Sequence, residues 1–151
     1  EMVSADIPEQ RLTDGGIVRI VAGSVAIDHQ LQQGPLPDIS TKPVFLDVHL
    51  TGNETVELSF NTEDPALVYV YKGTTDSMSS RQLGIYSSGN TLQLRAGSSG
   101  ADLLVLSGRP MHEPVVQHGP FVMNTSEEIE RALVDFRNPL FLDALTSNSK
   151  A

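Results

Sequence analysis

Hydrophobic and polar residues alternate along much of this chain, with the two-residue period of β-strands that bury one face. Residues 44–50 show the pattern most clearly. The aliphatic positions of this stretch, which point to one side, are Val44, Leu46, Val48 and Leu50. Phe45, Asp47 and His49 point to the other side. The pattern predicts a strand whose aliphatic face packs in a hydrophobic core.

Similar alternation, or a β-branched and aromatic run, predicts further strands at residues 16–23, 56–60, 67–71, 82–87, 91–95 and 101–107. Turn-forming residues separate these strands at 51–53, 61–65 and 97–100, and a Ser/Thr-rich loop is expected at 74–80. Ser88-Gly89-Asn90 predicts a hairpin that joins 82–87 to 91–95. The run 101–107 is almost continuously apolar, which predicts burial on both faces. Short strands at this regular spacing predict an all-β antiparallel barrel or sandwich.

Two segments lack a clear period. Residues 1–15 are mostly polar and are expected to form a lead-in or an interdomain linker. Between residues 24 and 43, a glycine and three prolines predict a long surface loop. A loop of this length is uncommon in a compact domain and often has a task such as covering a partner surface. The domain itself is expected to span residues 16–145, followed by a disordered tail at 146–151.

The segment from residue 108 to 125 predicts an extended strap, because prolines and glycines interrupt any regular helix. The strap residues that we single out as structural are Gly108, Pro110, Glu113, Pro114, His118, Gly119, Pro120 and Asn124. The strap leads into a predicted helix at residues 126–136. One face of this helix carries Ile129, Ala132, Leu133 and Phe136. Thr125 and Glu128 have the spacing of a capping box at the helix entrance.

Composition narrows the classes of function. The net charge is −9, and the ten Lys and Arg residues are scattered singly, which argues against direct binding of nucleic acid. The sequence contains no cysteine, which excludes disulfides and thiol catalysis. It also lacks an apolar run long enough to cross a membrane, and its first residues lack the features of a secretory signal. We therefore expect a cytoplasmic protein that binds neither membrane nor nucleic acid.

The strap also carries a resemblance to a known family. Its residues read Gly-x-Pro-x-x-Glu-Pro-Val-Val-x-His-Gly-Pro-Phe-Val-Met-Asn-Thr-x-Glu-Glu-Ile from Gly108 to Ile129, which resembles the signature that closes the C-terminal domain of the pirin family. The resemblance implies a cupin-type antiparallel β-barrel (jelly roll) with one C-terminal α-helix. Because pirins are two-domain cupin proteins, it also implies that this chain is their second half.

Cupin barrels that are active hold a metal ion, and the usual first motif is His-x-His followed by Glu. The stretch Tyr69-Val70-Tyr71-Lys72-Gly73 resembles the family's Tyr-Val-Leu-Glu-Gly and sets the register. Counting back, the His-x-His positions fall at Ser59 and Asn61, and the Glu position falls near Pro65. No histidine occurs at residues 82–94, where a further ligand would come from. The resemblance therefore implies no cofactor in this chain, with iron or another divalent metal in an N-terminal cupin.

Two other groups of residues are candidate sites. Asp47 and His49 share one strand face, with Glu54 close in sequence, and could form part of a metal site. The alternative is a polar strand face without a ligand. His112-Glu113 and His118 look like fragments of a metalloprotease motif, but Pro114 prevents the helix that such a motif requires. We expect Glu113 to be a structural carboxylate that accepts backbone N–H bonds, and His118 to be a hydrogen-bonded or surface imidazole.

Two functional hypotheses follow. The first is a metal-free structural and interaction module that supports a metal-dependent N-terminal cupin. The resemblance implies that such a parent is a quercetin 2,3-dioxygenase or a regulator that binds transcription factors or metabolic enzymes. The second is a metal-dependent dioxygenase with an unconventional site in this barrel or shared between chains. The expected partners are the N-terminal cupin half, a second copy of the chain in a homodimer, or other proteins.

Overall fold

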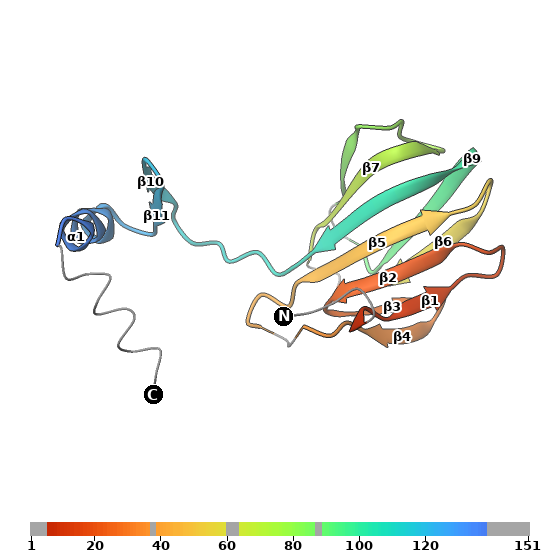
Figure 1. The fold of residues 1–151 in the computed structure, drawn as a ribbon, viewed down its shortest axis with the longest axis horizontal. Helices are drawn as coiled ribbons and strands as arrows, with labels where there is room; N and C mark the ends of the chain where they lie inside the picture. The colour runs from red at the N-terminus through yellow and green to blue at the C-terminus, as the bar shows by residue number, and fades with distance from the viewer. Residues whose placement is uncertain (1–5, 37–38, 60–63, 87–88, 139–151) are drawn as a thin grey trace. The chain divides into compact units, whose positions relative to one another are not determined.

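A computed structural model describes residues 6–36, 39–59, 64–86 and 89–138 (Figure 1). The chain divides into two compact units, Glu1–Pro110 and Met111–Ala151, which are described separately. The disordered tail predicted at 146–151 lies outside the described residues. Within the described residues, no helix is long and apolar enough to cross a membrane.

The first unit is built from antiparallel strands. They are β1 (Glu9–Arg11), β2 (Ile17–Ala22), β3 (Ser24–Ile27), β4 (Gln30–Gln33), β5 (Val44–Leu50), β6 (Thr55–Ser59), β7 (Ala66–Thr75), β8 (Leu83–Tyr86) and β9 (Thr91–Ser107). Their order is β1-β2-β5-β9-β6-β3-β4, with β7 between β9 and β8. The predicted all-β barrel is confirmed, and the predicted strand at 44–50 is present with the same bounds. The expected lead-in contains β1, which pairs with β2.

Strand β9 joins the two parts of the barrel because its two ends pair with different neighbours (Figure 1). Residues Thr91 to Arg95 pair with β6, whereas Ala101 to Ser107 lie between β5 and β7. The turn predicted at 97–100 is wrong, because β9 runs through it without a break. Gly100 has a φ of 86°, and a Cβ there would lie 2.7 Å from the carbonyl oxygen of Leu50. Glycine at this position therefore lets strands approach closely instead of marking a turn.

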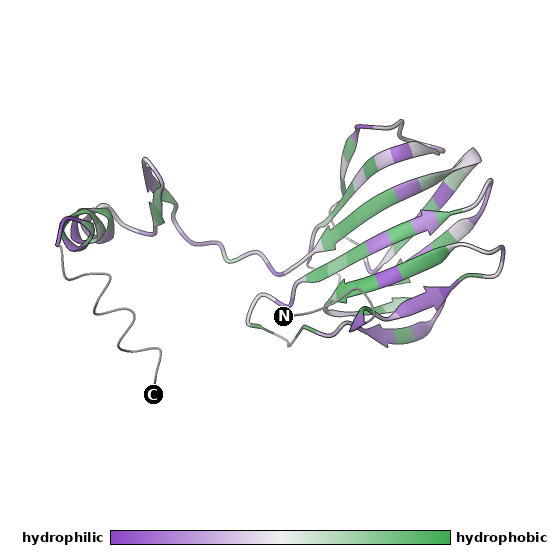
Figure 2. Ribbon diagram, viewed as in Figure 1, coloured by the Kyte–Doolittle hydropathy of each residue, from purple (hydrophilic) through white to green (hydrophobic). Residues whose placement is uncertain are grey.

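The barrel interior is aliphatic. The largest fully buried side chains are Ile20, Ile27, Leu46, Leu58, Leu103, Val18, Val25, Val48, Val56, Val68, Val70 and Val105. Each contributes roughly 1.5–3 kcal/mol through removal from water. Figure 2 shows the hydrophobic stretches along β2, β5 and β9. The expectation that 101–107 is buried on both faces is wrong, because Leu103 and Val105 are buried whereas Asp102 and Leu104 are partly exposed.

Part of the predicted loop at 24–43 is a hairpin of β3 and β4. Asp28 and His29 form its turn with φ of 46° and 68°, and neither is the glycine that usually marks such a turn. The Asp28 backbone N–H donates to the Glu57 carbonyl at 2.9 Å, and an Asp28 carboxylate oxygen accepts from the Glu57 N–H at 3.0 Å. Contacts to a distant strand therefore hold a turn that local residue preferences did not indicate.

The hairpin predicted between 82–87 and 91–95 is also wrong. Strand β8 pairs with β7, and the first part of β9 pairs with β6. The loop expected at 74–80 contains a tight turn. In it, the Thr75 N–H donates to the Met78 carbonyl at 2.7 Å, and the Met78 N–H donates to the Thr75 hydroxyl at 2.9 Å. After this turn the chain runs antiparallel to β7, and β8 therefore pairs with β7.

The second unit contains a small hairpin and the helix. Strands β10 (Val116–His118) and β11 (Phe121–Met123) pair, and α1 (Ser126–Phe136) has the predicted bounds. The Thr125 hydroxyl accepts from the Glu128 N–H at 3.2 Å, and the Glu128 carboxylate accepts from the Thr125 N–H at 2.9 Å. These reciprocal bonds form the capping box. The rings of Phe121 and Phe136 meet edge to face at 5.6 Å, which holds the helix on the hairpin.

Candidate functional site

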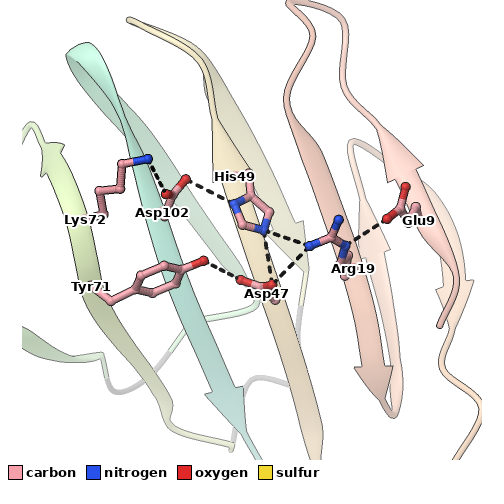
Figure 3. A network of polar contacts seen from close by, with 7 residues as sticks. All are labelled: Glu9, Arg19, Asp47, His49, Tyr71, Lys72 and Asp102. Carbon is pink, nitrogen blue, oxygen red and sulfur yellow. Dashed lines mark hydrogen bonds and ion pairs between the residues drawn. The ribbon is translucent and has the colours of Figure 1, made fainter. Parts of the chain in front are cut away.

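A network of polar side chains crosses the outward face of the barrel sheet (Figure 3). Asp47 and His49 project from β5 on the side opposite the buried Leu46 and Val48. Cross-strand register supplies their neighbours, because Arg19 on β2 pairs with Asp47, and Asp102 on β9 pairs with His49. The network therefore arises from strand pairing between segments that are distant in sequence.

His49 lies between two carboxylates. Its Nδ1 is 3.1 Å from Asp102, and its Nε2 is 3.1 Å from Asp47. Arg19 approaches from the other side, with Nη1 3.7 Å from Asp47 and Nε 2.8 Å from Glu9. Each of these side chains is therefore engaged by at least one oppositely charged or polar neighbour.

Two residues of β7 complete the network. The Tyr71 hydroxyl donates to the Asp47 carboxylate at 2.9 Å, and the Lys72 ammonium lies 3.3 Å from Asp102. Partial burial and the bond to Asp47 raise the pKa of the Tyr71 hydroxyl well above its ordinary value of 10.0. The hydrogen bond to Glu9 raises the pKa of the Arg19 guanidinium. The network thus favours a neutral tyrosine and a charged arginine.

This arrangement connects strands instead of presenting open ligand positions. Among the described residues, no group of three His, Asp or Glu side chains is placed to hold a metal ion. The oxygens of Asp47 are occupied by Tyr71, His49 and Arg19. Asp47 and His49 therefore make cross-strand contacts on the outward face of the sheet.

Glu54, the third residue considered with Asp47 and His49, lies elsewhere and is 2% exposed. Its carboxylate accepts backbone N–H bonds from Asp14, Gly16 and Thr51 at 2.8–3.1 Å. A carboxylate saturated in this way holds the turn before β2 against the turn before β6. Glu54 has a structural role that its sequence position did not reveal.

The remaining predicted positions are dispersed. Ser59 lies at the last position of β6, Pro65 lines an apolar pocket, and Asn61 is outside the described residues. His118 is exposed on β10. Glu113 accepts a bond of 2.7 Å from the side-chain amide of Asn124, whereas backbone donors were expected.

Arg19, Tyr71, Lys72 and Asp102 were not identified from the sequence as members of a site. The alternation on β5 indicates part of the site, because it puts Asp47 and His49 on the outward face of the sheet. Side chains from the neighbouring strands must lie beside them there. Choosing those neighbours requires the register of β2, β7 and β9. The register depends on contacts between distant segments, so local pattern could not supply it.

Beside the network, the outward face of the sheet becomes apolar. One row crosses four strands through Phe45, Leu106, Leu67 and Ile85. The next row carries Leu104, Tyr69 and Leu83. Ile85 is 72% exposed, and a pocket of about 360 Å³ opens between it, Leu67, Leu106 and Pro65. Such a continuous apolar face on a sheet is typical of an interaction surface.

Comparison with known proteins gives consistent results. The model of the pirin C-terminal cupin domain matches residues 45–142. A putative quercetin 2,3-dioxygenase of Vibrio cholerae is 33% identical over 134 residues, which are 86% of this chain and 47% of that protein. One of Pseudomonas aeruginosa is 34% identical over 140 residues, covering 88% of this chain and 49% of that protein. The chain therefore spans about half the length of these relatives.

Solved structures show the same fold. A quercetin 2,3-dioxygenase from Acinetobacter baumannii superposes with a TM-score of 0.80 and 29% identity, over 93% of this chain and 49% of that one. A protein from Geobacillus kaustophilus superposes with a TM-score of 0.57 at 20% identity, over 74% of this chain and 47% of that one. These likenesses confirm the predicted cupin-type barrel.

Proposed function

Because the chain belongs to the pirin family, we propose that it is the metal-free C-terminal cupin of a two-cupin protein. It acts as a structural and interaction module that supports a metal-dependent N-terminal cupin. Iron or another divalent metal is held in that N-terminal half, and the parent is a quercetin 2,3-dioxygenase or a transcription-related regulator. The proposal includes a cytoplasmic location.

One observation carries the metal-free assignment: the described barrel interior is filled by aliphatic side chains. Leu46, Val48, Leu103 and Val105 occupy the central inward positions and are fully buried. Metal ions in cupin-type sites need imidazole and carboxylate ligands. The candidate ligands Asp47 and His49 lie on the outward face of the sheet, where they bond to neighbouring side chains. A packed aliphatic interior supports a barrel that contributes stability and surface.

The interaction surface that we assign to the N-terminal cupin half is the apolar face centred on Leu106 and Ile85. We assign this face to the N-terminal half because the relatives are about twice as long as this chain. A second half of similar size needs a contact surface, and exposed apolar side chains in adjacent rows provide one. Where the N-terminal half is absent, a second copy of this chain occupies the same face.

Metal analysis combined with a quercetin assay tests the proposal. The chain is purified after expression with iron, analysed for bound transition metals, and assayed for oxygen-dependent loss of quercetin. The full-length Acinetobacter baumannii quercetin 2,3-dioxygenase serves as the control for assay conditions. We expect no stoichiometric metal and no turnover by the chain alone.

The competing dioxygenase hypothesis predicts the opposite result. Stoichiometric iron, or turnover that His49→Ala abolishes, would show that an unconventional site on this barrel is active. Metal uptake only when two chains associate would favour a site shared between chains. Either outcome would overturn the metal-free assignment.

A further inference from the structure

A second pocket, outside the network and the apolar face, lies at one end of the barrel. It encloses about 350 Å³, within the range of small-molecule sites. Its lining includes the first residue of β5, Val44, and the last residues of β6 and β9, Ser59 and Ser107. The pocket is therefore formed where several strands end, and the packed interior lies beyond it.

Two cations line this pocket, Lys42 and Arg109. The backbone brings them together, because the Arg109 N–H donates to the carbonyl of Thr41 at 2.8 Å. A turn in which the Lys42 N–H donates to the Ile39 carbonyl at 2.9 Å holds the lysine there with a φ of 43°. Neither side chain is within ion-pair distance of a carboxylate among the described contacts. Two neighbouring positive charges without such a partner favour an anion between them.

Two buried polar atoms also line the pocket. The Oδ1 of Asp64 and the Oγ of Ser107 are shielded from solvent and have no hydrogen-bond partner among the residues that the structure describes. Buried polar atoms in native proteins nearly always have a partner, which is a bound water or a ligand where no protein group is within reach, so this pair can bond a molecule in the cavity. Asp64 offers an acceptor, and Ser107 offers a hydroxyl that donates or accepts.

The lining also has an apolar part, which includes Val25, Leu31 and Val44. We propose that this pocket binds a small amphipathic carboxylate that also carries a hydroxyl group. The carboxylate lies between Lys42 and Arg109, the hydroxyl donates to Asp64, and the ligand's apolar body packs on the three aliphatic side chains. The Asp64 carboxylate would repel a compact, doubly charged anion, which favours a singly charged carboxylate over inorganic phosphate.

A set of matched probes tests each part of this assignment. Binding of 4-hydroxybenzoate to the full chain is followed by the amide chemical shifts of pocket residues in NMR titrations. Benzoate lacks the hydroxyl, 4-hydroxybenzamide lacks the charge, and inorganic phosphate lacks the apolar body. We expect saturable shifts around Lys42, Ser107 and Arg109 with 4-hydroxybenzoate, weaker binding of benzoate, and the weakest binding of 4-hydroxybenzamide and phosphate.

Substitutions in the chain distinguish binding in the pocket from a response of the probe to surface charge in general. Arg109→Gln is expected to weaken 4-hydroxybenzoate binding on the order of tenfold, because a charge-assisted bond is lost. Arg95→Gln removes an exposed arginine of β9 that does not line the pocket, and it should leave the affinity unchanged. Asp64→Ala should abolish the preference for 4-hydroxybenzoate over benzoate.

Three outcomes would overturn the assignment. The first is the absence of saturable shifts with 4-hydroxybenzoate. The second is tighter binding of inorganic phosphate than of 4-hydroxybenzoate. The third is equal weakening by Arg109→Gln and Arg95→Gln, which would mean that the probe responds to net charge and not to this pocket. None of these outcomes depends on the metal content or the quercetin activity of the chain.

Discussion

The buried carboxylate of Glu54 accepts a hydrogen bond from the backbone N–H of Gly16 at 3.1 Å, between positions that are 38 residues apart. Gly16 is required for this contact, because a Cβ at that position would lie 2.3 Å from a Glu54 oxygen and 2.6 Å from the His49 carbonyl. The bond connects the entrance of β2 to the turn before β6, and both strands contribute to the barrel core.

Glu54→Gln is expected to destabilise the fold by about 1–3 kcal/mol, because one amide oxygen cannot replace two carboxylate oxygens that accept from buried backbone donors. Urea unfolding followed by circular dichroism measures the change. Glu57→Gln, on strand β6 just after Glu54 and partly exposed, is the matched control and should change stability little. Equal effects of the two substitutions would contradict a special role for the Glu54 carboxylate.

Tyr71→Phe is expected to flatten the loss of stability at alkaline pH. The folded state raises the pKa of Tyr71 above its ordinary value of 10.0, so folding favours the neutral hydroxyl. This contribution is fully present below pH 10 and is lost as pH rises, because the unfolded chain ionises first. Unfolding midpoints measured from pH 8 upward should therefore fall more steeply in the parent chain than in the variant. Parallel curves would show that Tyr71 ionisation is not linked to folding.

Without an N-terminal half, the chain is expected to form a dimer through the apolar face. Ile85→Lys places a charge in the most exposed part of that face and should shift the equilibrium to monomer. Leu31→Lys is a matched control, since Leu31 is 76% exposed but lies on β4. Sedimentation velocity over a range of concentrations distinguishes the species. A parent chain that sediments as a monomer at every concentration would refute the proposed use of this face.

Thr125→Ala is expected to loosen the start of α1 by about 1 kcal/mol, because the Glu128 N–H loses its side-chain acceptor. Amide hydrogen exchange at Glu128 and Ile129 should become faster, while exchange in the barrel strands stays the same. Ser126→Ala, at the next position, makes none of the capping bonds and should have a smaller effect. Unchanged exchange in Thr125→Ala would show that hairpin packing alone holds the helix.

Local sequence pattern was sufficient where one segment carries all the information that its structure needs. Strand β5 follows from the alternation of residues 44–50, since burying Leu46 and Val48 requires the opposite face for Asp47 and His49. The start of α1 follows from Thr125 and Glu128, whose capping bonds lie within one turn of helix. The sequence also shows directly that Ser59 and residues 82–94 provide no histidine for a cupin metal site.

Tertiary structure alone decided which segments meet. The hairpin of β3 and β4 depends on Asp28 contacts to Glu57, and the pairing of β8 with β7 depends on the turn at Thr75 to Met78. The partners of Asp47 and His49, the acceptor role of Glu54 and the proximity of Lys42 to Arg109 all come from register or turns between distant residues. Periodicity specifies which way a side chain points, whereas the neighbour it meets is set by long-range pairing that buries the aliphatic faces together.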